Sequence, residues 1–284
     1  MSLASPITVS PEQISTWRDA IGRTSVLRQT LDEASLQRFA VATGAGPEIE
    51  ACPPPLAHWA YFLEAEATAR LGPDGHPQRG LGLLPPITLP RRMFAAGAMQ
   101  FHATLSLREA AELSLTVADV TLRQGKTGDL VFVELDRVLS QQGQARVSER
   151  QTLVYRGQGD PVPPVSDGQI AGSPTDQVWT PTTVELFRFS AATFNAHRIH
   201  YDQGYAREVE GYPDLVVHGP LTAARLASLA VRQAGGAPLR TFHFRAVAPL
   251  FVNQPVRLSA GDAPGRVLAT RCDGTLAMSA EALL

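Results

Sequence analysis

The residues most suited to chemistry lie in one short polar segment, residues 195–202, with the sequence Asn-Ala-His-Arg-Ile-His-Tyr-Asp. The chain has seven histidines, and His197 and His200 stand in this segment. A third, His218, comes directly before Gly219-Pro220. Histidine titrates near pH 6.5 and can take or give a proton at neutral pH. Imidazoles beside a glycine that begins a helix predict acid–base chemistry on a polarised carbonyl.

Composition limits the partners of this site. The chain has 284 residues, 44% of them hydrophobic, and a net charge of -2, so we expect a large buried core and no nucleic-acid partner. No apolar run reaches the length of a membrane span, and the first residues show no signal-peptide pattern. Two distant cysteines, Cys52 and Cys272, favour reduced thiols and a cytoplasmic location.

The first half of the chain is predicted to begin with helices and to continue with strands. Ser10 and Thr30 each mark a helix start. Apolar spacing predicts a longer helix over residues 56–71. Strands follow between residues 87 and 156, with a hairpin turn at residues 125–128.

The second half repeats this plan after a linker at residues 157–180, which is rich in glycine and proline. Thr182 begins a capping box. Gly219-Pro220 opens the longest helix, residues 221–233, which is apolar on most sides and therefore buried. Strands are predicted at residues 241–246, 256–260, 267–271 and 275–283.

The shared plan predicts an α+β chain made of two similar units, residues 1–156 and 181–284. Each unit is expected to wrap an antiparallel sheet around one central helix, because a curved sheet buries most of such a helix. The repeat is one of architecture, since the two sequences hardly match.

The polar segment and its surroundings resemble a known family. Residues 189–202, Glu210-Gly211-Tyr212-Pro213 and residues 216–220 resemble the hydroxyacyl-thioester dehydratase type 2 and mesaconyl-C4-CoA hydratase group of MaoC-like hydratases. Residues 89–93 and 125–133 are similar to the first, degenerate unit of that group. The resemblance implies a double hot-dog fold, with two antiparallel sheets each wrapped around a central helix.

The resemblance also implies an activity: reversible hydration of an enoyl-CoA, with a short branched or dicarboxylic one such as mesaconyl-C4-CoA as a candidate substrate. The wider family carries an Asp-x-Asn-Pro-x-His-x-Asp motif. His200 matches its catalytic histidine, whereas Asn195 stands in place of its catalytic aspartate, His197 in place of its asparagine and Arg198 in place of its proline. An amide cannot accept a proton as a carboxylate does.

In the addition of water to a double bond conjugated with a thioester, we expect the following roles for the residues of this segment and of the helix start. His200 suits the proton transfers. The carbonyl oxygen of Asn195 is expected to orient the water. Free backbone N–H groups at the start of the 221–233 helix suit the enolate oxygen, and Gly219 lets the substrate approach closely.

Each residue also has a purely structural interpretation. His200 would then be a buried histidine bonded to backbone, Asn195 a turn residue and Gly219 a simple helix start. His197 would support His200 or pack only, and His218 would orient its loop.

The remaining charged and aromatic residues have open roles. Arg198 reaches a CoA phosphate, a substrate carboxylate or a surface ion pair. Arg91 and Arg92 either bind substrate or form a solvated strand end. Asp202 is expected to cap a helix, and Tyr201 is expected to support the site.

Rival functions follow from the same residues. A thioesterase of this fold needs an acid on the long helix, and residues 221–233 have none. A carrier-protein dehydratase and a non-catalytic acyl-thioester-binding subunit stay open. His197, His200 and Asp202 give a weak metal pattern without a clearly spaced further ligand, so neither metal nor cofactor is expected. The expected partner is an acyl-CoA, with a homodimer as one candidate assembly.

Overall fold

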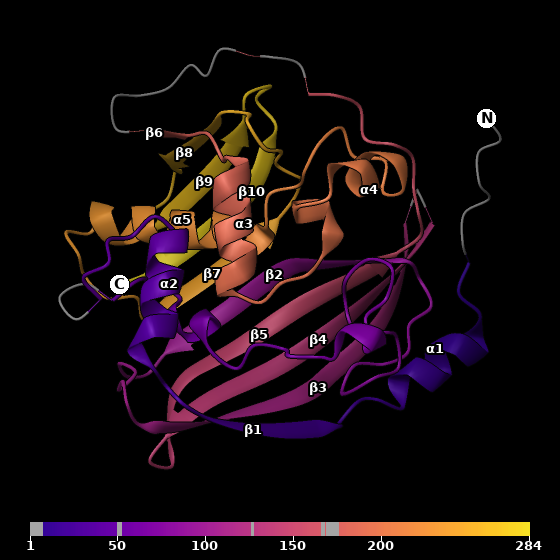
Figure 1. Ribbon diagram of the computed structural model, residues 1–284, viewed down its shortest axis with the longest axis horizontal. Coiled ribbons are helices and arrows are strands. Elements are labelled where there is room, and N and C mark those ends of the chain that lie inside the picture. The colour runs from indigo at the N-terminus through magenta and orange to yellow at the C-terminus, as the bar shows by residue number, and fades with distance from the viewer. Residues whose placement is uncertain (1–7, 50–52, 126–127, 166–167, 169–175) are drawn as a thin grey trace.

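The computed structural model describes residues 8–49, 53–125, 128–165, 168 and 176–284. Ten strands form one antiparallel sheet in the order β1-β3-β4-β5-β2-β7-β10-β9-β8-β6 (Figure 1). The strands are β1 (Thr24–Thr30), β2 (Arg91–Phe101), β3 (Ala110–Gly125), β4 (Gly128–Gln141), β5 (Gln144–Arg156), β6 (Gln177–Trp179), β7 (Thr241–Ala246), β8 (Val256–Ala260), β9 (Arg266–Arg271) and β10 (Leu276–Leu283).

The two expected sheets are joined edge to edge by the antiparallel pairing of β2 with β7. Gly97 lies opposite Phe244 at this junction, and a Cβ at position 97 would lie 2.5 Å from the Phe244 ring. A glycine here lets the aromatic side chain cross the seam. The sheets of the two halves therefore form one continuous surface.

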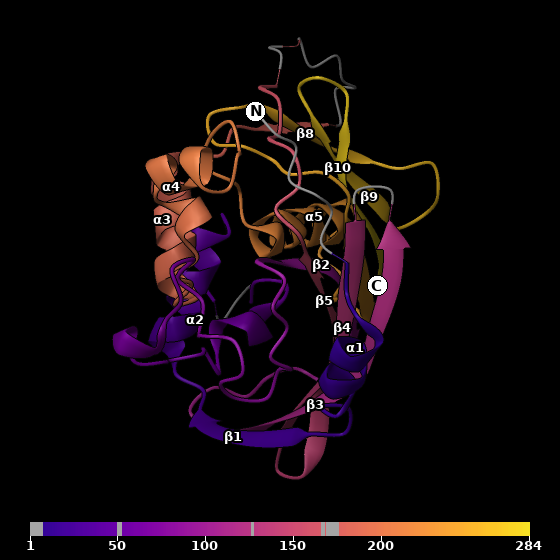
Figure 2. The same cartoon turned by 90° about the vertical axis from the view of Figure 1, so that its right-hand side faces the viewer.

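The helix that fills the second half is α5 (Gly219–Gln233), with Pro220 in its first turn as predicted. Its buried residues include Leu221, Leu226 and Leu229. Figure 2 shows α5 between the sheet and an outer layer of α2 (Glu33–Ala42), α3 (Thr183–Ala192) and α4 (Gln203–Glu208). This sandwich explains why α5 is apolar on most sides.

The helix predicted over residues 56–71 is wrong. The chain forms two short 3₁₀ turns instead, η1 (Ala57–Ala60) and η2 (Thr68–Arg70). Leu56 and Phe62 have φ values of 60° and 55°, which no α-helix accommodates. The Trp59 indole donates to Glu149 and the Tyr61 hydroxyl donates to the Asp32 carbonyl, so tertiary contacts override the apolar spacing.

The other helix starts were predicted with mixed success. Capping boxes at Ser10 and Thr182 begin α1 (Pro11–Arg18) and α3. The start at Thr30 is wrong, because Thr30 ends β1 and Asp32 caps α2 instead. Among the described residues, none of the helices has the length and apolar character needed to cross a membrane.

The predicted hairpin is confirmed by the pairing of Gly125 with Gly128, although residues 126 and 127 lie outside the described residues, as does Cys52. The end of the predicted linker is not irregular, since β6 pairs with β8. The four predicted strands of the second half match β7, β8, β9 and β10 to within one residue.

Candidate active site

A cavity of about 1380 Å³ contains the predicted chemistry. Its walls include Leu113, Leu115 and Leu153 from the first half of the sheet and much of the irregular segment 61–85. His200 and Gly219 of the second half line the same cavity. The two halves of the chain therefore share one site.

The polar segment is held in a fixed shape after α3. The Asn195 backbone N–H donates to the Ser190 carbonyl over 2.8 Å. The Asn195 side-chain oxygen accepts the backbone N–H of His197 over 2.9 Å, a local turn typical of asparagine. Asn195 lines the cavity, but one lone pair of its oxygen is already engaged, which leaves only the second for a water.

His200 lies at the end of η3 (Arg198–His200), which is a single turn. Its Nδ1 lies 2.7 Å from the Val216 carbonyl oxygen, so Nδ1 carries the proton and Nε2 has a free lone pair. Burial lowers the pKa of His200 to about 4, although the bond to Val216 opposes this shift. His200 is therefore a neutral base at physiological pH.

His218 lies behind His200 and away from the cavity. The two rings stack with centroids 3.6 Å apart and an interplanar angle of 21°. His218 is fully buried, and its Nε2 lies 2.9 Å from the Ser190 hydroxyl. These contacts restrict the orientation of the His200 ring.

The start of α5 lies on the cavity wall. The first N–H groups of a helix have no partner within it, and Pro220 has no N–H at all. A Cβ at Gly219 would lie 3.6 Å from the Phe94 backbone oxygen of β2. That distance is an ordinary contact, so it does not by itself require a glycine, but Gly219 lines the cavity and places the N-terminus of α5 on its wall.

The two arginines of the Arg91-Arg92 pair occupy different surroundings. Arg91 is buried, not solvated, and pairs through Nε with Glu210 over 3.0 Å. It also donates to the Glu210 backbone oxygen and lies over the Tyr212 ring. Arg92 lines the cavity and Arg91 does not, so only the second of the pair lies on the wall of the site.

Arg198 and Tyr201 lie at the edge of the site. The Arg198 guanidinium pairs with Asp202 over 2.7 Å and donates to the Pro73 backbone oxygen. Asp202 also caps α4, as predicted, by accepting the Tyr205 N–H. Tyr201 lines the cavity mouth and is 51% exposed.

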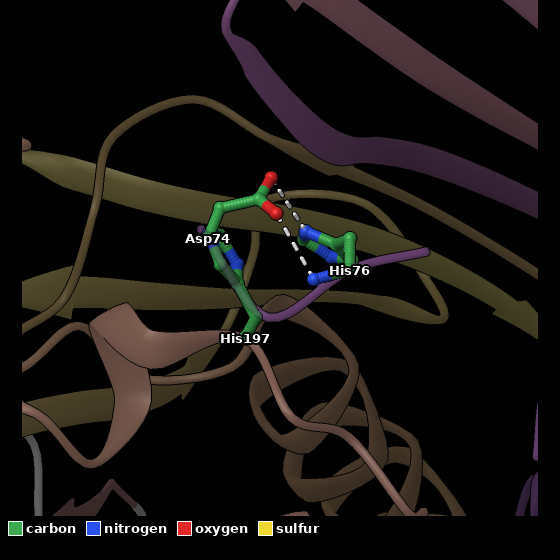
Figure 3. A group of neighbouring side chains, drawn as sticks. All are labelled: Asp74, His76 and His197. Carbon is green, nitrogen blue, oxygen red and sulfur yellow. Dashed lines mark hydrogen bonds and ion pairs between the residues drawn. The ribbon is translucent and has the colours of Figure 1, made fainter. Parts of the chain in front are cut away.

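Two residues of the site were missed from the sequence, Asp74 and His76. The Gly72–Gly75 stretch was interpreted only as the end of a helix. The Asp74 carboxylate accepts the His76 backbone N–H and lies 3.2 Å from His76 Nδ1 (Figure 3). The Asp-x-His spacing in a chain with few histidines was the available signal. Asp74, His76 and His197 each offer an atom within 4.8 Å of the others, a spacing open to a metal ion.

Comparisons with known proteins show the family of the chain. The family model of hydroxyacyl-thioester dehydratase type 2 matches residues 56–252. A mesaconyl-C(4)-CoA hydratase from Chloroflexus aurantiacus is 42% identical over 276 residues, which cover 93% of this chain and 96% of the relative.

Solved structures share the fold. A MaoC-like dehydratase from Phytophthora capsici superposes with a TM-score of 0.71 at 12% identity, over 95% of this chain and 97% of that one. A protein from Mycobacterium tuberculosis described as a double hotdog fold gives 0.57 at 13% identity, over 92% and 95% of the two chains.

The sheet, the buried α5 and these neighbours define an α+β protein of the double hot-dog fold. The chain belongs to the hydroxyacyl-thioester dehydratase type 2 family. It is a hydro-lyase that adds water to, or removes water from, an acyl thioester.

Proposed function

We propose that the chain reversibly hydrates an enoyl-CoA whose acyl group carries a second carboxylate, such as mesaconyl-C4-CoA. The observation that carries the proposal is Arg92, a cation on the cavity wall. Its guanidinium makes no hydrogen bond or ion pair with any residue that the structure describes. A carboxylate is the ligand that a free guanidinium binds best. The 42% identical relative is named as a mesaconyl-C(4)-CoA hydratase.

The roles of the catalytic residues follow from the geometry of the cavity. His200 transfers the proton at the α carbon through its free Nε2. The Gly219 N–H at the start of α5 stabilises the enolate oxygen, where such a donor contributes about 3–4 kcal/mol. Asn195 fixes the segment through His197 and offers its remaining lone pair to water. His197 and His218 support the His200 ring.

In this proposal the two halves of the chain have different roles. Residues 1–156 form the degenerate unit that shapes the acyl pocket, and residues 181–284 form the catalytic unit. A cytoplasmic location and a homodimer complete the proposal, and sedimentation of the purified chain tests the assembly.

The test compares two substrates on wild type and on Arg92→Gln. Hydration of mesaconyl-C4-CoA and crotonyl-CoA is followed by loss of the conjugated thioester absorbance. Because charge-assisted hydrogen bonds contribute about 1.5–3 kcal/mol, Arg92→Gln should raise KM roughly 10- to 100-fold for mesaconyl-C4-CoA only. Arg245→Gln, at an exposed position on β7, is the matched control.

Two results would contradict the proposal. Equal losses with both substrates would remove Arg92 from carboxylate binding. A preference for carrier-protein thioesters over CoA thioesters would identify the chain as a carrier-protein dehydratase.

A further inference from the structure

The loop at residues 72–77 belongs to the first half of the chain but is fixed against the polar segment of the second half. The Arg198 backbone N–H donates to the Asp74 carbonyl over 2.9 Å. A Cβ at Gly75 would lie 1.8 Å from the Ala196 backbone oxygen. The backbones are therefore in direct contact, and the loop has a defined position in the site.

Within this loop the Asp74 carboxylate fixes the His76 ring. One carboxylate oxygen accepts the His76 backbone N–H over 3.0 Å and the other lies 3.2 Å from Nδ1. Both side chains are 17% exposed. A carboxylate on Nδ1 holds the proton there and leaves the lone pair of Nε2 free.

His76 lies among the residues already assigned to the site. Its ring centroid is 4.2 Å from that of His197, which is 5.3 Å from that of His200. His76 lines the same cavity as His200 and Gly219, whereas Asp74 does not line it. Burial and the charge of Arg92 lower the pKa of His76 to about 4, although Asp74 opposes them, so its imidazole is neutral at physiological pH.

The reaction needs two proton transfers, at the attacking water and at the α carbon. His200 has one free nitrogen, because its other nitrogen is bonded to Val216. The amide of Asn195 has no basic site. Among the described residues that line the cavity, His76 is an imidazole whose ring is fixed by a carboxylate.

We infer that His76 is a second catalytic acid–base residue of this site and that Asp74 is its positioning residue, an inference that rests on the proposed function. The base for water comes from the first half of the chain and the group for the α carbon from the second. Neither half holds the complete machinery.

The proton balance of the hydration is closed. Nε2 of His76 takes a proton from water as the water oxygen bonds to C3 of the enoyl group. The C2–C3 π pair moves onto the thioester, whose oxygen is held by the Gly219 N–H. The proton then passes from His76 through water in the cavity to Nε2 of the neutral His200, which delivers it to C2. Both imidazoles are neutral at the end, as they were at the start.

A metal ion bound by Asp74, His76 and His197 is the competing use of the same atoms. Two observations oppose it. Both oxygens of Asp74 already accept bonds from His76. The positive charge of Arg92 acts on both His76 and His197 and would repel a cation.

The central experiment measures enoyl-CoA hydration by His76→Gln. We expect kcat to fall at least ~100-fold, the scale of lost acid–base catalysis, with a thermal unfolding midpoint equal to that of wild type. His243→Gln, which changes an exposed histidine on β7, should keep the wild-type rate. If His76→Gln does not fold, His76→Ala assayed with added free imidazole carries the test, since rescue requires a missing proton carrier.

Asp74→Asn tests the positioning role. The groups that face His76 are Asp74, Arg79, Arg92, His197 and His200. Of these, Asp74 raises the pKa of His76, so its removal should move the acid limb of the rate profile to lower pH. We expect kcat to fall with little change in KM, a pattern that a purely structural role would not produce.

The outcomes separate this inference from the proposed function. A wild-type chain that hydrates no enoyl-CoA overturns the proposed function. An active wild type with an inactive His200→Ala and a fully active His76→Gln overturns the inference alone. Stoichiometric metal in wild type that is lost in His76→Gln also overturns it, and makes His76 a ligand instead of a base.

Discussion

The two ends of the sheet cover the same kind of surface in different ways. Across β7–β10 the surface is filled by α5, whose side chains pack as a core. Across β1–β5 the irregular segment 61–85 takes that place, and the large cavity lies between. A helix fills a groove with a regular row of side chains, whereas a loop leaves volume and exposes polar groups. The β7–β10 end supplies the fixed dipole of α5, and the β1–β5 end supplies the volume of the cavity.

The largest expected effect tests whether catalysis resides at the α5 end. His200→Ala should lower kcat at least ~100-fold, because it removes the group that moves the proton at the α carbon. The measurement is steady-state hydration of crotonyl-CoA, with His243→Ala as the exposed control. Near-normal turnover in a folded His200→Ala variant would show that another group moves this proton.

The next effect tests the contact between loop 72–77 of the first half and the polar segment 195–202 of the second half. Gly75 has φ of +89° and no space for a Cβ, whereas Gly82 has φ of +76° and nothing within 4 Å. Gly75→Ala should lower the free energy of unfolding by about 2 kcal/mol more than Gly82→Ala, because overpacking adds to the shared backbone strain. Denaturant titration measures this difference. Equal losses in the two variants would show that loop 72–77 is not packed on the polar segment.

A smaller effect tests whether the acyl group of the substrate lies at the β1–β5 end of the sheet. Leu153→Trp fills part of the cavity wall and should raise KM about 10-fold for long-chain enoyl-CoAs, the scale of one or two displaced methylenes. Crotonyl-CoA should be unaffected. Leu283→Trp, at a position 57% exposed on β10, is the control. A loss for short and long chains alike would place the acyl group elsewhere.

The smallest effect concerns pH and stability. His200 and His76 have folded pKa values of about 4 against 6.5, so the unfolded chain binds more protons between these values and stability falls as pH falls. As the pH falls from 7.5 to 6, each of these two histidines should lower the free energy of unfolding by about 1 kcal/mol. Replacing His200 with Gln should flatten the dependence measured by thermal unfolding. An unchanged slope would mean that the pKa of His200 is the same in the folded and the unfolded chain.

The second half was predictable because its signals are local. The strands predicted at residues 241–246 and 256–260 match β7 and β8, and Gly219-Pro220 marks the start of α5. In the first half, the spacing of Leu56, Trp59 and Leu63 resembled a helix, but the Trp59 bond to Glu149 on β5 decided the conformation. No window of neighbouring residues contains that contact.

The site was predictable in the same uneven way. The polar segment could be recognised in the sequence because its two histidines lie three residues apart on one turn. Asp74 and His76 lie more than a hundred residues before His197, and only the folded backbone brings them together. Arg91 and Arg92 are adjacent in sequence, yet alternation along β2 sends their side chains to different surroundings.

The two hot-dog units lie in one covalent chain, and the pairing of β2 with β7 joins their sheets. Two identical subunits related by a twofold axis would have to carry the same pocket twice, and any change in one would appear in the other. Fusion removes that symmetry requirement. The first unit can therefore leave its sheet without a central helix and enclose a large cavity, while the second keeps α5 over its own sheet.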